Sequence, residues 1–180
     1  RNVFTLAPGA SDIYTTHTLF GSGTPVNPTT PRTNTGTFAV DGNRILYSGI
    51  TSVTDIAIAP TKGFDYHGID ITAEFDDNGI VGDGLGEATE QSGEGTLVTF
   101  QEPVTNFNIR LGTGNDAFNI IAFDSTAASV LTIDGNDGDD TLDGTTLPRA
   151  VRLNGGLGDD TLTGSVFDDT VSGNEGNDAI

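Results

Sequence analysis

The sequence predicts an all-β protein: a C-terminal stack of short parallel strands, or β-solenoid, preceded by a β-rich region of sandwich or irregular solenoid type. Between residues 41 and 109, apolar and polar residues alternate in short stretches that Gly, Asp and Asn separate, as in strands joined by turns. From residue 111 onward, variants of a nine-residue unit of glycine, aspartate and one aliphatic residue recur, which indicates a coiled repeat. A 3.6-residue apolar period, which would indicate helices, is absent.

The composition limits the possible partners. The chain has 26 acidic and only 7 basic residues, for a formal net charge of −19. This charge repels nucleic-acid phosphates and anionic membranes but suits cations, so we expect neither nucleic-acid binding nor membrane insertion. No apolar run approaches the roughly 18 residues that cross a bilayer. Cysteine is absent, which excludes disulfides and thiolate metal sites.

Residues 1–40 are rich in Thr, Pro and Gly, which predicts an extended segment with strands at "DIYTTHTLF" (12–20) and "GTFAV" (36–40). In the β-rich region 41–109, the expected strands are "NRILYSGI" (43–50), "VTDIAIA" (53–59), "GIDITAEF" (68–75), "GTLVTF" (95–100) and "TNFNIRL" (105–111). Tyr47, Tyr66 and the ten Phe residues are interpreted as core. The stretch "DDNGIVGDG" (76–84) alternates oxygen donors, as a second cation loop or a solvated acidic turn would.

Residues 110–180 contain the unit Gly-Gly-x-Gly-x-Asp-x-U-x, where U is a large aliphatic residue. Its first six residues form a turn, and the next three form a strand with U pointing inward. Two units make one coil, so turns on one edge recur after two units, as from Gly155 to Gly173. The interval from Gly135 to Gly155 is longer by two positions, because the unit at 144–154 exceeds nine residues by two. The expected inward residues are Leu142, Val151, Leu162, Val171 and Ile180.

A single file of aliphatic side chains is a thin core, so the turns need another source of stability. Ca²⁺ can supply it, because the ion takes about six to eight oxygen ligands and mixes carboxylates with backbone carbonyls. Without a cation, the sixth-position aspartates of stacked turns form a column of like charges. The alternative is a metal-free coil in which these aspartates make only local hydrogen bonds to the backbone.

These repeats, most clearly at 134–180, resemble the RTX family of bacterial calcium-binding repeats. The resemblance implies a parallel β-roll, secretion, and folding driven by Ca²⁺ outside the cell. The family's ligand aspartate matches Asp140, Asp160, Asp178 and, across a six-residue insertion, Asp116. Its carbonyl-donating turn glycines match Gly135, Gly138, Gly155, Gly156, Gly158, Gly173 and Gly176.

The chain departs from the family's pattern at a few positions. Asp139 and Asp159 occupy a position that the pattern leaves free, so we expect them to face solvent. On the opposite edge, Arg149 stands where a ligand aspartate belongs, and Asp169 holds the same place one coil later. We therefore predict an Arg149–Asp169 salt bridge there in place of calcium.

The sequence contains no recognisable catalytic signature, so we expect a protein that is not an enzyme. The favoured function is a calcium-binding structural component of a secreted or cell-surface bacterial assembly, such as a fibre or surface protein. Its expected partners are calcium ions and neighbouring copies or further repeats of the same protein. The chain lacks an initial Met and ends within a repeat, so we expect a piece of a longer protein. The alternatives are a non-catalytic secretion or stability module of a secreted enzyme, and an adhesin or glycan-binding module.

Overall fold

The fold is all-β, as the sequence predicted. The computed structural model describes residues 3–6, 14–19, 35–40, 43–48, 52–55, 61–66, 70–80, 82–90, 97–103, 105–124 and 130–180. These residues form sixteen strands and no helix, so this part of the chain holds no helix able to cross a membrane.

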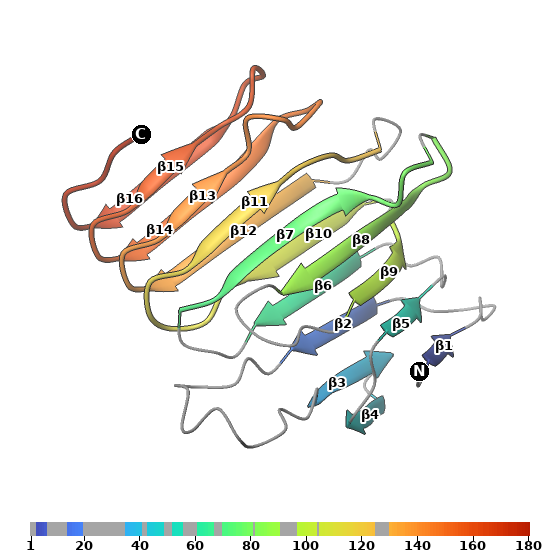
Figure 1. Cartoon of the computed structure of the whole chain (residues 1–180). Helices are drawn as coiled ribbons and strands as arrows, with labels where there is room; N and C mark the ends of the chain where they lie inside the picture. The colour runs from blue at the N-terminus through green and yellow to red at the C-terminus, as the bar shows by residue number, and fades with distance from the viewer. Residues whose placement is uncertain are drawn as a thin grey trace.

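Two eight-stranded sheets lie one over the other (Figure 1). Sheet A runs in the order β1 (Val3–Leu6), β5 (Ser52–Asp55), β9 (Leu97–Gln101), β8 (Leu85–Glu90), β7 (Thr72–Asp77), β11 (Ala117–Ile120), β13 (Thr141–Asp143) and β15 (Thr161–Thr163). Sheet B runs in the order β16 (Thr170–Glu175), β14 (Val151–Leu157), β12 (Val130–Asp137), β10 (Asn106–Arg110), β6 (Thr61–Tyr66), β2 (Tyr14–Leu19), β3 (Thr35–Val40) and β4 (Asn43–Ser48). Both sheets are open.

From β10 to β16 the chain enters the two sheets alternately, and every pairing within this part is parallel. Leu131 of β12 lies beside Val151 of β14, an offset equal to the interval from Gly135 to Gly155. Arg152 of β14 lies beside Thr170 of β16, an offset equal to the shorter interval from Gly155 to Gly173. These are the two offsets that the glycine spacing predicts, so the register prediction for this part is confirmed.

Earlier strands interrupt the parallel pattern with two antiparallel stretches, β2–β3–β4 and β7–β8–β9. Other early strands still pair in parallel: β6 pairs with β2 on one side and with β10 on the other. Both sheets contain strands from all three predicted segments, 1–40, 41–109 and 110–180. The division into those segments stays a prediction.

Most of the predicted strands are present, within a few residues of their expected bounds. The sequence prediction missed three strands. One is β1 "VFTL", in the segment predicted to be extended, and the other two are β6 "TKGFDY" and β8 "LGEATE". Strands β6 and β8 each contain a glycine that interrupts the alternating pattern, Gly63 in β6 and Gly86 in β8. At Gly86 the missing side chain has a packing reason: an added Cβ would contact the ring of Phe100 on the paired strand.

The core lies between the sheets and is dominated by aromatic rings. Phe64 of sheet B packs edge-on against Phe75 of sheet A, with ring centroids 5.0 Å apart, and Phe107 stacks on Phe75 at 5.3 Å. Where side chains are described, Tyr66 and six Phe residues are buried, as predicted. Phe167 is the exception, because it lies half exposed in the turn before β16.

Toward β16 the core narrows to aliphatic residues. Leu142, Val151 and Leu162 are buried as predicted, and Val171 packs against them only in part. The prediction for Ile180 is wrong, since this side chain is 77 % exposed. Ile180 follows the bridge between Thr161 and Ala179 at the open end of sheet A, where no described strand covers it.

A buried ion pair links the two sheets. Nζ of Lys62 in β6 lies 2.7 Å from Oδ2 of Asp55 in β5, and both side chains are fully buried. The same ammonium group also donates a hydrogen bond to the backbone carbonyl of Asp55 at 3.3 Å. Because a buried charge is costly without a partner, this pair fixes the relative position of the two strands.

Candidate metal-binding sites

The predicted ligand aspartates stack in one column, here called the aspartate ladder: Asp116, Asp140, Asp160 and Asp178. Oδ1 of each accepts a hydrogen bond from the backbone N–H of the residue stacked in the preceding turn. The donors are Ile71, Asp116, Asp140 and Asp160, at 2.6, 2.8, 2.8 and 3.0 Å. The structure therefore brings Asp116 into the column despite its 24-residue separation from Asp140. The longer β11–β12 connection accommodates the predicted insertion.

In the described structure, the second carboxylate oxygen has no hydrogen-bond partner in three of the four ladder aspartates. Asp116, Asp140 and Asp160 are at most 2 % exposed, and Oδ2 of each is buried without a hydrogen bond. Burial raises the pKa of Asp140 to about 7 and that of Asp116 to about 6, although backbone hydrogen bonds oppose the rise. Burial also raises the pKa of Asp160. Such atoms call for a proton or a cation.

The first glycine of each repeat unit makes room beside this second oxygen. The prediction that the unit begins with a turn is wrong at this residue, because Gly135, Gly155 and Gly173 lie in the strands β12, β14 and β16. An added Cβ at Gly135, Gly155 or Gly173 would overlap Oδ2 of the aspartate five residues later. The same Cβ on Gly135 would also meet the carbonyl oxygen of Gly155, and one on Gly155 would meet that of Gly173. A carboxylate oxygen and a carbonyl oxygen of the next turn thus lie beside the same small space, which fits an oxygen-liganded cation.

The other predicted turn glycines allow close stacking of the turns. Their backbone φ angles are all positive, at Gly138 (127°), Gly156 (129°), Gly158 (125°) and Gly176 (148°). An added Cβ at any of them would overlap a backbone carbonyl oxygen of the preceding turn. At Gly158, for example, the oxygen belongs to Gly138. A larger residue here would strain the backbone and also push the turns apart.

Asn115, Asp139 and Asp159 form a second column, which we call the outer ladder. The sequence prediction missed it. Asp139 and Asp159 are exposed, as expected, but each also accepts a backbone hydrogen bond. Oδ1 of Asp139 accepts from the N–H of Asp159, and Oδ1 of Asp159 accepts from the N–H of Asn177, both at 2.8 Å. Oδ1 of Asn115 accepts from Asp139 at 3.1 Å. An amide thus serves as well as a carboxylate in this column.

On the opposite edge, the predicted Arg149–Asp169 salt bridge is wrong. The guanidinium group of Arg149 lies over the ring of Phe123, 4.3 Å from its centroid. The Asp169 carboxylate is satisfied locally: Oδ1 accepts from the N–H of Val151 at 2.8 Å, and Oδ2 accepts from the N–H of Ser165 at 2.6 Å. Each group therefore has a different partner.

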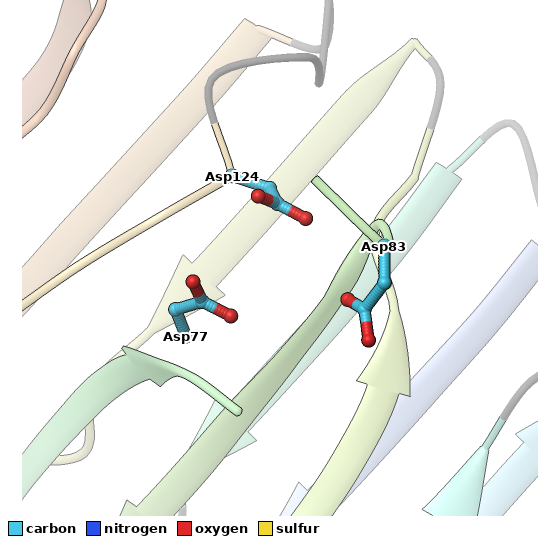
Figure 2. A group of neighbouring side chains, drawn as sticks. All are labelled: Asp77, Asp83 and Asp124. Atoms are coloured by element: carbon cyan, nitrogen blue, oxygen red, sulfur yellow. The ribbon is translucent and has the colours of Figure 1, made fainter. Parts of the chain in front are cut away.

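A separate acidic group lies at the far ends of β7 and β11, and Figure 2 shows its three carboxylates turned toward a common space. Asp77 ends β7, Asp83 belongs to the turn before β8, and Asp124 follows β11. One carboxylate oxygen from each lies within 4.8 Å of the other two. Asp124 is buried, and its two oxygens accept hydrogen bonds from the N–H groups of Gly82 at 2.5 Å and Gly84 at 2.6 Å.

Two buried oxygens, one in this group and one beside it, have no hydrogen-bond partner in the described structure. Oδ1 of Asp77 is buried without a hydrogen bond, and so is Oε2 of Glu102. Oε1 of Glu102 accepts from the backbone N–H of Asp124 at 3.1 Å. Burial raises the pKa of Glu102 to about 7, although the backbone hydrogen bond from Asp124 and the positive charge of Arg149 oppose the rise; the charges of Asp124 and Asp77 add to it. The sequence signalled Asp77 and Asp83 through their motif, but nothing in the sequence marked Asp124 or Glu102.

Comparisons of the chain with protein-family models, with curated proteins and with solved structures find no match. What the protein does is therefore inferred from its two groups of aspartates. Both groups offer only oxygen ligands, which hard cations such as Ca²⁺ and Mg²⁺ prefer over imidazole or thiolate.

Proposed function

We propose that this chain is a calcium-binding structural component of a secreted or cell-surface bacterial assembly, in which Ca²⁺ folds and stiffens the repeats. The observation that carries the proposal is the buried, unpartnered Oδ2 atom of successive ladder aspartates, with a glycine that has no room for a Cβ beside it at Asp140 and Asp160. The RTX-like sequence of the turns supports the same function. In this role the protein is not an enzyme.

The proposal also includes the arrangement of the strands as a coil. Strands β10 to β16 alternate between the sheets, and their offsets match the glycine intervals of the repeat, which supports a parallel β-roll or β-solenoid with two strands per coil. In such a coil every turn is completed by its neighbours. Ligands for one ion would then come from consecutive turns, and binding would couple the folding of one coil to that of the next.

Local hydrogen bonding alone does not account for the ladder. An asparagine would accept the backbone hydrogen bond as well as an aspartate does, without burying a charge. In the outer ladder, Asn115 accepts in the same way as Asp139 and Asp159. The aspartate ladder instead has a carboxylate in all four turns, which places like charges in a column. That choice costs free energy unless a cation offsets it.

The residues that would hold calcium are Asp116, Asp140, Asp160 and Asp178, with carbonyl oxygens of the turn glycines. Ca²⁺ would supply positive charge and oxygen coordination where Oδ2 now lacks a partner. The chain's own residues do the rest: the Oδ1 hydrogen bonds orient each carboxylate, and the glycines let the turns approach.

Assembly with neighbouring copies or further repeats is also part of the proposal. Within the described structure, β16 pairs with another strand on one side only, whereas the outer edge of β15 carries the bridge between Thr161 and Ala179. The free edge of β16 carries unpaired backbone groups that can hydrogen-bond to another strand. In the turn before β16, Val166 is 86 % exposed and Phe167 half exposed, so apolar surface is available to a partner.

The proposal is tested by circular dichroism and thermal unfolding, first in EDTA and then during titration with Ca²⁺ to millimolar concentration. We expect β-structure and melting temperature to rise cooperatively with Ca²⁺, and Mg²⁺ to substitute poorly because it demands a stricter geometry. An unchanged spectrum and melting curve would contradict the proposal and leave a metal-free solenoid.

A further inference from the structure

The turn between β7 and β8 contacts the segment after β11 through Asp124. The Asp124 carboxylate accepts hydrogen bonds from Gly82 and Gly84 and so already holds the two segments together. Asp83 is held from within the turn, since its Oδ2 accepts from Nδ2 of Asn78 at 3.0 Å. The three carboxylates of Asp77, Asp83 and Asp124 are therefore fixed close to one another, within 4.8 Å.

Three carboxylates at this spacing repel one another, because their interaction is only partly screened in a half-buried site. Hydrogen bonds satisfy Asp124 and Asp83 but leave Oδ1 of Asp77 buried without a partner. Glu102 adds an independent observation. It is only 5 % exposed, it contacts the backbone of Asp124, and its Oε2 lacks a hydrogen-bond partner, although the positive charge of Arg149 acts on its carboxylate. Both unpartnered oxygens thus belong to residues of this group or in contact with it.

We propose that Asp77, Asp83 and Asp124 form a second calcium site that is separate from the aspartate ladder. The three proposed ligands are all carboxylate oxygens, which hard divalent cations prefer. The side chains range from buried Asp124 to exposed Asp83, so an ion can enter from solvent while most of its ligands are already fixed. Figure 2 shows the space that the three carboxylates share.

The location of this site determines which segments a bound cation would link. The ladder lies before β7 and β11, whereas the three aspartates lie at or beyond the opposite ends of these strands. A cation here clamps the β7–β8 turn to the β11–β12 connection. It thereby adds a second link between the antiparallel stretch β7–β9 and the parallel part of sheet A, which the pairing of β7 with β11 already joins. The ladder and this site share no residue.

The test counts Ca²⁺ bound per chain after equilibrium dialysis of the whole protein. Asp83→Asn removes one charge at an exposed position and keeps one of the two oxygens that accept hydrogen bonds, from Asn78 and from the N–H of Leu85. Asp168→Asn is the matched control, an exposed aspartate elsewhere with the same change of charge. We expect Asp83→Asn to bind one ion fewer than the wild type and Asp168→Asn to bind the same number. Asp77→Asn serves as a second variant should Asp83→Asn fold poorly, and circular dichroism checks both.

The outcomes separate this site from the proposed function. If the wild type binds several ions and Asp83→Asn binds as many, the second site is overturned while the ladder survives. If the wild type binds a single ion that both Asp83→Asn and Asp77→Asn lose, the second site stands and the ladder fails. A wild-type chain that binds no Ca²⁺ overturns both.

Discussion

The backbone N–H of Asp140 donates to Oδ1 of Asp160 over 2.8 Å, while Oδ2 of the same Asp160 carboxylate is buried without a hydrogen-bond partner. The two oxygens therefore have different roles. Oδ1 joins one turn to the next and needs only an acceptor, whereas Oδ2 needs positive charge. Substitutions that keep the acceptor and remove the charge can separate these roles.

Asp160→Asn should weaken calcium binding but not the metal-free fold. The amide oxygen can still accept from Asp140, so the melting temperature in EDTA should stay the same or rise. The calcium affinity should fall at least about tenfold, equivalent to about 1.4 kcal/mol. Calorimetric titration and thermal unfolding measure the two effects. The neighbouring Asp159→Asn, in the exposed outer ladder, is the control and should change neither quantity; equal effects of both substitutions would contradict the assigned roles.

Stability without metal should fall as the pH rises. The pKa values of Asp116, Asp140 and Glu102 are raised to about 6, 7 and 7, so the folded state binds these protons more tightly than the unfolded state. Their contribution to stability is therefore full below about pH 4 and is lost as the pH rises to about 7. In EDTA the protein should melt at a higher temperature at about pH 5 than at about pH 8.

Calcium should weaken or reverse that dependence, because ligation requires ionised carboxylates. Thermal unfolding at both pH values, with EDTA and with Ca²⁺, measures the effect. A melting temperature in EDTA that is higher at the alkaline pH would show that the buried carboxylates do not control stability.

Gly155→Ala should disrupt the ladder sterically. The added Cβ would overlap Oδ2 of Asp160 and approach the carbonyl oxygen of Gly173. We expect a loss of about 1–3 kcal/mol in the free energy of unfolding, as for other overpacked sites. Gly79→Ala is the comparison, because Gly79 has a positive φ of 88° but open space around it, and should cost only about 1 kcal/mol. Chemical denaturation measures both; a smaller loss at Gly155 than at Gly79 would contradict the proposed crowding.

Lys62→Met should be among the most damaging single substitutions, because it leaves the buried Asp55 carboxylate without its cation. The expected loss is about 3–5 kcal/mol. Adding Asp55→Asn should restore part of it. Arg110→Met is the control: Arg110 is 62 % exposed and lies 3.9–4.0 Å from its acidic partners, so its loss should stay below about 1 kcal/mol. Similar losses in denaturant unfolding for the two substitutions would contradict this ranking.

The register of the C-terminal strands could be predicted from the sequence because glycine and aspartate are each required at fixed places in the turn. Their spacing determined both strand offsets and the buried positions of Leu142 and Leu162. The position of Asp116 in the column followed from the same rule, since the extra residues lie in the connection between β11 and β12.

Other features could not be read from the sequence because they depend on distant residues. Nothing near Asp124 in sequence indicates that Gly82 and Gly84, about forty positions earlier, supply its hydrogen bonds. Arg149 occupies the position in the repeat where a ligand aspartate is expected. Its side chain nevertheless packs on Phe123, which lies in the longer β11–β12 connection. The antiparallel strand β8 likewise follows from pairing with β7 and β9 rather than from its own pattern.

The most direct test of the central claim is a crystal structure grown in Ca²⁺ and measured at a wavelength that gives an anomalous signal from calcium. We predict anomalous peaks beside Oδ2 of Asp140 and Asp160, within bonding distance of these oxygens. Ca²⁺ at saturating concentration with no peak near either oxygen would contradict the claim that calcium completes the ladder.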